Sequence, residues 1–337
     1  MNKTIRRGAR MQIEKEGIDD VLHVLYEALR KDGRYHKGSR GGTRELLSVA
    51  IRIRNPRARI SRSEDRGKPF SAVGELLWYL AGSNKLEFIV PYIDLYKEDA
   101  EDDGTLHGAY GPRLVNMRDK INQLENVFEL LKAKPGSKRA VIQLFDADDL
   151  VGDFKEIPCT TTAQFLVREG RVHLSVTMRS NDAYYGLPHD VFCFTMLQEM
   201  VARRLGYDIG EYYHYVGSMH VYEDFLPDLD NYLEEGWHRT EGMPPMPEGN
   251  PFELVGMILK AEAAARSGEN FRAEDFVAEP YWADVLRLVQ VFWASGNGER
   301  LDQLKSEFHS QIYRTHLESR RHLRRRVNLD TVGEVTK

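Results

Sequence analysis

The chain has 337 residues, of which 42% are hydrophobic and 29% are charged, and its formal net charge is -5 at pH 7. This composition is ordinary for a globular protein with a sizeable core, and the small negative charge argues against a protein that coats nucleic acid through bulk charge. Two cysteines cannot form a disulfide framework, and they do not have the spacing of a zinc site.

Targeting and membrane signals are absent from the sequence. No window approaches the roughly 18–20 apolar residues that a membrane span needs. The start, "MNKTIRRGARMQIEKEG", is basic but has no apolar segment of the kind found in secretory signals. We therefore expect a cytoplasmic protein with reduced thiols and no membrane association.

The first half of the chain predicts two helices and a strand. Residues 19–33 have apolar residues at helical spacing, acids at the start, and a basic end closed by glycine. Residues 46–56 are aliphatic and β-branched and are interrupted by Asn-Pro, which favours a strand. Residues 70–83 predict a buried helix that carries one acid, Glu75.

Further along, strands alternate with one long apolar helix. Residues 138–146 predict a strand, and residues 162–180 predict two strands around a tight Glu-Gly turn. Residues 186–206 begin near a proline and end in arginines and a glycine, which is typical of a helix. No glycine-rich dinucleotide fingerprint, P-loop or HExxH pair is present, so nucleotide-dependent dehydrogenases, NTPases and metalloproteases are disfavoured.

The character of the chain changes after about residue 237. "MPPMPEGNP" is a Pro/Gly linker, and from Phe252 onward the pattern is that of charged amphipathic helices. We predict an α+β catalytic core over residues 1–237, and a linker with a mostly helical C-terminal extension over residues 238–337.

The stretch "EIPCTTTAQFLV" places Cys159 at a turn before a predicted strand. Alone, such a cysteine could pack as a small apolar residue or act as a nucleophile. Cys193 lies among apolar residues at helical spacing, which favours a core position.

Two further motifs supply polar groups. In "RSNDAYYGLPHD", Arg179 and Ser180 at a strand end suit a phosphate, which accepts two bonds from a guanidinium and one from a hydroxyl. An ordinary polar loop is the alternative. In "YVGSMHVYED", His220 and Tyr222 would share one face of a strand, although two half-buried aromatic side chains would show the same pattern.

Six dispersed motifs in this order, "ELLWYL", "HGAYG", "SKRAVIQL", "IPC…QF", "RSND…GLP" and "GSMHVY", resemble the thymidylate synthase superfamily over about residues 19–235. The resemblance implies a three-layer α+β fold with a mixed β-sheet and packed helices. It also implies a homodimer whose phosphate site is shared between subunits, a methylenetetrahydrofolate co-substrate and no metal.

The resemblance assigns a role to thirteen residues. Cys159 matches the nucleophile, Tyr110 a tyrosine near the thiol, and Glu75 a glutamate that organises water and proton transfer. The substrate-binding residues implied are Arg40, Arg179 and Ser180 for the phosphate, Lys138 and Arg139 reaching it from the other subunit, and His220 and Tyr222 for the sugar hydroxyl. Asp182 and Gly186 match folate-contacting positions, and Asp190 a position that reads the base.

These residue types suit a known chemistry. Carbon 5 of a pyrimidine becomes nucleophilic only after a thiolate adds at carbon 6, and nearby arginines are expected to lower the pKa of Cys159. Carbon 5 then accepts the one-carbon unit. Addition of hydride yields a methyl group, whereas addition of water yields a hydroxymethyl group.

The base preference depends on Asp190. Thymidylate synthases carry asparagine there, which accepts from N3–H and donates to the 4-carbonyl of uracil. A protonated aspartate donates to N3 and accepts from the amine of cytosine, and buried mismatches of this kind can discriminate by about 10⁴-fold. The position therefore resembles the deoxycytidylate hydroxymethylase branch; outside that context, an acid here would simply favour the helix start.

Three other departures bear on the reaction. Thr160 stands where thymidylate synthases usually have histidine, and the short apolar C-terminus that closes over the folate is replaced by about a hundred residues. A changed lid is compatible with water addition, because exclusion of water protects the intermediate for hydride. Lys138 replaces the first of two arginines and lacks the bidentate fork, which leaves ribose and deoxyribose both open.

We therefore expect a cytoplasmic homodimer that converts CMP or dCMP to its 5-hydroxymethyl derivative. The enzyme alternative is a thymidylate synthase that acts on dUMP. A third alternative is an inactive homologue that binds RNA through "ESRRHLRRRVNL", but the segment lacks interleaved aromatic residues. We favour a solvated helix face or a subunit contact for its arginines.

Overall fold

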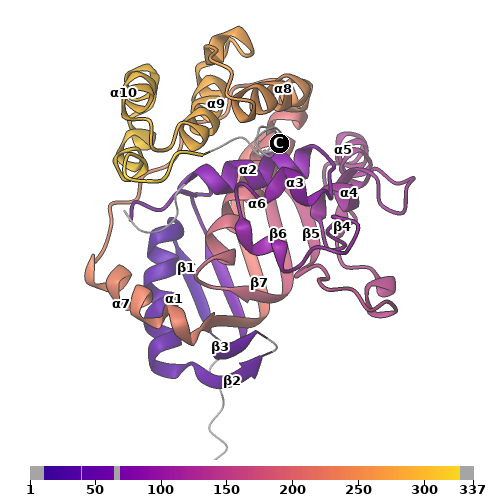
Figure 1. The fold of residues 1–337 in the computed structure, drawn as a ribbon. Helices are drawn as coiled ribbons and strands as arrows, with labels where there is room; N and C mark the ends of the chain where they lie inside the picture. The colour runs from indigo at the N-terminus through magenta and orange to yellow at the C-terminus, as the bar shows by residue number, and fades with distance from the viewer. Residues whose placement is uncertain (1–10, 39, 64–68, 327–337) are drawn as a thin grey trace, which may run out of the picture.

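The computed structural model describes residues 11–38, 40–63 and 69–326. In these ranges the strands form one seven-stranded mixed sheet in the order β1-β3-β7-β6-β5-β4, with β2 paired to β3 (Figure 1). β1 runs parallel to β3 and β6 parallel to β7, and the remaining pairs are antiparallel. The strands are β1 Gln12–Lys15, β2 Arg34–Gly38, β3 Gly41–Ile53, β4 Val141–Gln143, β5 Thr160–Arg168, β6 Arg171–Asp182 and β7 Asp208–Tyr222.

Helices cover this sheet in layers. The α-helices are α1 Ile18–Asp32, α2 Pro69–Leu80, α3 Leu86–Ile89, α4 Tyr110–Val115, α5 Gln123–Ala133, α6 Gly186–Leu205, α7 Leu226–Glu234, α8 Val255–Arg266, α9 Pro280–Trp293 and α10 Gly298–Glu307. α6 packs on β6 and β7, α2 packs on α6, and α9 packs on α2. In Figure 1 the C-terminal helices, in orange and yellow, lie above α2, whereas α1 and α7 lie beside β1 and β3. The α+β class with a mixed sheet is therefore confirmed.

Most of the expected elements are present. The hairpin turn has Glu169 at φ 51° and Gly170 at φ 71°, as a tight two-residue turn requires. α6 ends at Gly206 with φ 74°, the left-handed conformation that glycine adopts without strain. Cys193 is buried in the core as predicted, and its thiol donates to the carbonyl of Ala72.

Two strand predictions have wrong boundaries. The predicted strand over residues 138–146 is reduced to β4, because Asp146 begins a capped 3-10 turn. β3 starts five residues earlier than the predicted strand, at Gly41, and ends before Pro56. The first residues of β3 pair with β2, a polar strand that the search for apolar residues did not detect.

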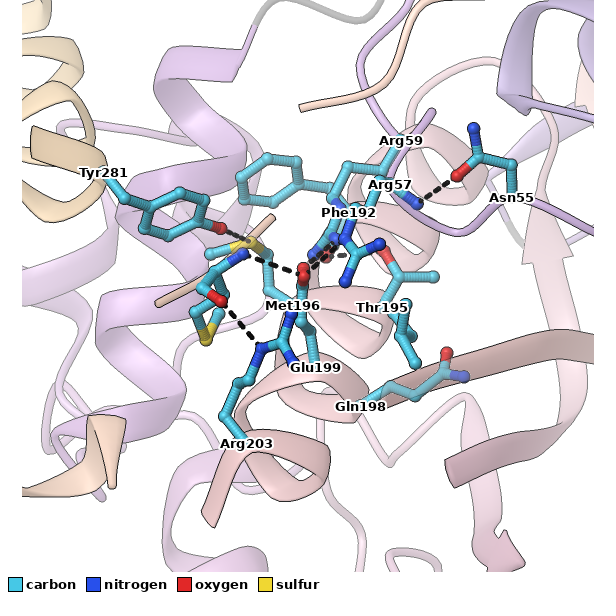
Figure 2. Close-up of polar contacts among 12 residues, drawn as sticks. Asn55, Arg57, Arg59, Phe192, Thr195, Met196, Gln198, Glu199, Arg203 and Tyr281 are labelled. Carbon is cyan, nitrogen blue, oxygen red and sulfur yellow. Dashed lines mark hydrogen bonds and ion pairs between the residues drawn. The ribbon is translucent and has the colours of Figure 1, made fainter. Parts of the chain in front are cut away.

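A buried ion-pair network joins α6 to two distant loops (Figure 2). Glu199 accepts hydrogen bonds from Arg57 Nε at 2.7 Å, from the Arg59 guanidinium, and from the Met246 amide at 3.0 Å. Both Glu199 and the Arg59 side chain are fully buried. The network ties the linker around residue 246 to the helix that lies on the sheet.

The predicted linker and C-terminal extension, residues 238–337, begin with residues 238–250, which contain no helix or strand. The division into two parts stays a prediction. Buried apolar residues of α9 such as Trp282 and Leu286 belong to the same continuous core as Leu77 of α2.

The C-terminal arginines do not share one solvated helix face, although Arg324 and Arg325 are exposed. The subunit contact, which we favoured equally, stays a prediction. Arg320 is buried, with its guanidinium 4.7 Å from the centre of the Phe70 ring, and Arg326 lies 3.6 Å from that of Phe292. Arg321 pairs with Asp302. Residues 327–329 of the motif lie outside the described ranges.

Candidate active site

The thiol of Cys159 lies at the entrance to β5, in a segment held by Arg179. The amide of Arg179 donates to the carbonyl of Cys159 at 2.8 Å. Its guanidinium donates to the carbonyls of Pro158 and Ile157 at 2.9 and 2.8 Å. The structure thus brings together the predicted nucleophile and one of the predicted phosphate ligands.

The expected direction of the thiol pKa is wrong for this structure. Burial raises the pKa of Cys159 to about 11, and the charge of Glu156 raises it further, whereas Arg179 and Arg40 lower it. The arginines act as expected, but desolvation of the half-buried thiol outweighs them. Cys159 is therefore a neutral thiol in the unliganded protein at neutral pH.

Glu156 is a site residue that the motif reading missed. Burial, followed by the charge of Asp99, raises its pKa to about 7, against the opposing effects of Arg179, Arg113 and Arg40. Its carboxylate occupies the space where a Cβ at Gly108 would lie. Its only sequence signal was its place three residues before the cysteine in "EIPC".

Glu75 lies under the site on α2 and is 5% exposed. Its Oε1 accepts hydrogen bonds from the hydroxyls of Tyr79 and Tyr96 at 3.0 and 2.9 Å. Tyr79 also contacts Tyr110, and the centres of their rings are 5.2 Å apart. The carboxylate is therefore held in place by two hydroxyls.

Tyr110 contacts the residue directly after the nucleophile. Its hydroxyl oxygen accepts from the amide of Thr160 at 3.0 Å and lies 2.9 Å from the Thr160 hydroxyl. The predicted position near the thiol is thus where the structure places it. Thr160, which stands where thymidylate synthases usually have histidine, is fully buried, and its amide and hydroxyl contact Tyr110.

Asp190 lies on α6 just after its first turn and is 8% exposed. Its Oδ2 accepts from Asn181 Nδ2 at 2.7 Å, and Asn181 Oδ1 lies 3.0 Å from Nε2 of His214. Burial and the nearby charge of Glu75 raise the pKa of Asp190 well above its usual range, although the bond from Asn181 acts in the opposite direction. Burial therefore favours the neutral form of the Asp190 carboxyl. Asn181 and His214 were not predicted, because their contact joins two strands.

The other predicted ligands gather at the ends of β6 and β7. The Ser180 hydroxyl lies 3.4 Å from His220 Nδ1, and the rings of His220 and Tyr222 are 5.4 Å apart on one face of β7. Arg40, in the loop before β3, donates to the carboxylate of Asp99. These positions agree with a shared polar site.

Lys138 and Arg139 are not brought to Cys159 within one chain. Both are exposed in the loop before β4. The neighbouring Ala140 accepts from the amide of Phe165, six residues along β5 from Cys159, or roughly 20 Å at the rise of a strand. A role at the phosphate therefore requires a second subunit.

The predicted folate residues lie at the turn into α6. The Oδ1 of Asp182 accepts from the amides of Tyr184 and Tyr185 at 2.7 and 3.3 Å, which fixes the turn. A Cβ at Gly186 would lie 2.9 Å from Asn181 Nδ2. A larger residue here would have to displace the Asn181 amide that contacts Asp190. Its place beside Asp190 is compatible with a ligand ring next to the base.

Neither a metal cluster nor a membrane span is found in the described part of the chain. It contains no group of three or more His, Cys, Asp and Glu side chains that could hold a metal ion. No described helix combines the length and apolar character needed to cross a membrane.

Comparison with known proteins gives a consistent result. The sequence profile of the family described as thymidylate synthase matches residues 31–285. The chain is 32% identical over 230 residues to the thymidylate synthase of Bacillus mojavensis, which covers 66% of this chain and 80% of the relative. It is 33% identical over 171 residues to the thymidylate synthase of Bacillus phage phi3T, covering 49% and 61%.

A relative with a different name has a comparable identity over a shorter stretch. The deoxyuridylate hydroxymethyltransferase of Bacillus phage SP01 is 34% identical over 194 residues, covering 54% of this chain and 51% of the relative. The chain thus spans between half and four fifths of these relatives' lengths.

Proposed function

This chain belongs to the thymidylate synthase family of one-carbon transferases, and on that premise we propose that it converts CMP or dCMP to the 5-hydroxymethyl nucleotide. The co-substrates are methylenetetrahydrofolate, which the family uses, and water. The products are the hydroxymethylated nucleotide and tetrahydrofolate, so the nucleotide gains one CH2O unit.

The observation that carries the proposal is the buried carboxyl of Asp190, which accepts from the amide of Asn181 at 2.7 Å and whose pKa is raised well above its usual range by burial. In its neutral form this carboxyl offers one donor and one acceptor. That pair complements N3 and the 4-amino group of cytosine. A charged carboxylate would offer two acceptors and would match neither base.

The remaining residues support a covalent route. Cys159 loses its proton and its sulfur bonds to carbon 6, which makes carbon 5 nucleophilic. Because the pKa of the thiol is about 11, this step needs a base, and Glu156 titrates near neutral pH close by. Glu75, held by Tyr79 and Tyr96, is placed to orient water and relay protons.

Folate would supply the one-carbon unit and leave as tetrahydrofolate. Asp182 and Gly186 lie at the turn beside Asp190, so the residues assigned to the folate neighbour those assigned to the base. This arrangement supports a folate ring placed beside the pyrimidine.

We propose a homodimer because one subunit does not bring together all the residues that we assign to the phosphate. Arg40, Arg179 and Ser180 come from one chain, whereas Lys138 and Arg139 are exposed at the far edge of the sheet. The sheet also presents exposed apolar side chains: Leu47 on β3 is 70% exposed and Tyr215 on β7 is 44% exposed. Association through the sheet would cover them and bring the partner's cations to the phosphate.

Two other reactions are favoured by the relatives' names. One is methylation of dUMP, as in a thymidylate synthase, and the other is hydroxymethylation of dUMP. Both reactions would require a site with Asp190 to bind uracil.

Product mass distinguishes these reactions. The protein would be incubated with methylenetetrahydrofolate and, separately, with CMP, dCMP and dUMP. We expect a gain of CH2O on a cytosine nucleotide without dihydrofolate. A gain of CH2 on dUMP with dihydrofolate, or of CH2O on dUMP alone, would overturn the proposed substrate.

A further inference from the structure

A line of buried polar side chains runs from Asp190 into the core. Asn181 is the second-last residue of β6, and Tyr212 and His214 lie on β7, where both are fully buried. Tyr212 Oη lies 2.8 Å from His214 Nδ1, His214 Nε2 lies 3.0 Å from Asn181 Oδ1, and Asn181 Nδ2 lies 2.7 Å from Asp190 Oδ2.

The direction of these hydrogen bonds follows from the ionisation of their members. Burial lowers the pKa of His214 to about 3, so the ring is neutral and carries one N–H. Burial raises the pKa of Tyr212 well above its usual range, so its hydroxyl keeps its hydrogen. Tyr212 then donates to Nδ1, and the ring hydrogen on Nε2 is donated to Asn181.

The orientation of the Asn181 amide decides which of its atoms faces Asp190. Its oxygen is engaged by His214, so its amide nitrogen faces Asp190 Oδ2 and donates to it. Because Oδ2 of Asp190 already accepts a hydrogen bond from Asn181, it binds the proton of a neutral carboxyl less favourably than Oδ1 does. In the neutral form of Asp190, Oδ1 is therefore the better place for the proton.

We propose that Tyr212, His214 and Asn181 act as positioning residues that fix the Asp190 proton on Oδ1 and thereby make the base preference one-sided. A free neutral carboxyl can exchange its donor and acceptor oxygens and so complement either cytosine or uracil. Under the proposed function, on which this inference rests, Oδ1 donates to N3 and Oδ2 accepts from the amine. The order needed for uracil would put the proton on Oδ2, opposite the N–H of Asn181.

The test removes the buried end of the line. In Tyr212→Phe, His214 Nδ1 loses its donor, so either ring tautomer and either orientation of Asn181 become accessible. We expect the ratio of affinities for CMP over UMP, and for dCMP over dUMP, to fall by about fivefold or more. Tyr213→Phe is the matched control, because that hydroxyl donates to Glu211 on the same strand, and its ratio should equal that of the wild type.

Calorimetric binding of each nucleotide gives the ratio, and thermal unfolding reports on folding. Asn181→Ala is the second variant, since it removes the donor to Asp190 directly, and it should lower the ratio at least as much. Loss of affinity for both bases equally, or an unchanged ratio in both variants, would overturn the inference.

This test is separate from that of the proposed function. If the wild type makes thymidylate but both variants lose discrimination, the inference holds and the proposed substrate is wrong. If the wild type hydroxymethylates a cytosine nucleotide and the ratios do not move, the proposed function holds and the inference is wrong.

Discussion

The buried network around Glu199 leads to a specific expectation for stability. Glu199→Gln keeps the size of the side chain but removes the charge that neutralises Arg59, whose side chain is fully buried. Loss of one partner from a buried ion pair costs about 3–5 kcal/mol. For 337 residues, an unfolding entropy of about 2.1 cal/mol/K per residue converts this to a fall in Tm of about 4–7 °C.

The pH dependence has a defined sign. Burial acts to raise the pKa of Glu199, but Arg59 and Arg57 outweigh it and hold the pKa below its usual range in the folded protein. The stabilisation is therefore present above the pKa of the unfolded chain, about 4.5, and is lost as pH falls through the lower folded value.

Thermal and urea unfolding at neutral pH and in acid would measure both effects. The matched control is Glu125→Gln, because the Glu125–Arg204 pair is partly exposed and should contribute about 0–1 kcal/mol. Equal losses in the two variants, or a Glu199→Gln loss that persists unchanged in acid, would refute the reasoning.

Three further predictions concern the site. Cys159→Ser should form no product yet bind nucleotide, and turnover by this variant would exclude covalent catalysis. The rate of alkylation of Cys159 by iodoacetamide should rise with pH with a midpoint near pH 11, so that about one thiol in a thousand is ionised at pH 8. In Glu156→Gln this midpoint should move to lower pH. A midpoint below pH 9 in the wild type would contradict the burial argument. Gly186→Ala should weaken nucleotide binding and lower stability by about 1–3 kcal/mol, because its Cβ would lie 2.9 Å from Asn181 Nδ2; unchanged binding would show that Asn181 moves without consequence.

Local pattern was enough to predict elements whose signals are local. The hairpin over residues 162–180 follows from Glu169-Gly170 and alternating side chains, and α6 from its apolar run and closing glycine. The pairing of His220 with Tyr222 on one strand face needed only the two-residue period.

Contacts across strands and the degree of burial were beyond that reasoning. Asn181 and His214 are 33 residues apart, and nothing in either motif indicates that they meet. The charges near Cys159 could be read from the motifs, but the sign of its pKa shift depends on desolvation, which only the packed structure shows. For the same reason the burial of Arg320 was not predicted, since its guanidinium lies over the rings of Phe70 and Phe292, which are distant in the sequence.

Helix α2 serves two parts of the molecule at once. It carries Glu75 toward the site, and it also packs against α9, while Arg320 covers Phe70 at its start. A chain shortened before α9 would expose the apolar side of the helix that carries Glu75, the carboxylate proposed to relay protons. The C-terminal residues that meet α2 are therefore constrained together with the active site, and substitutions should accumulate more freely in the parts of the extension that face solvent.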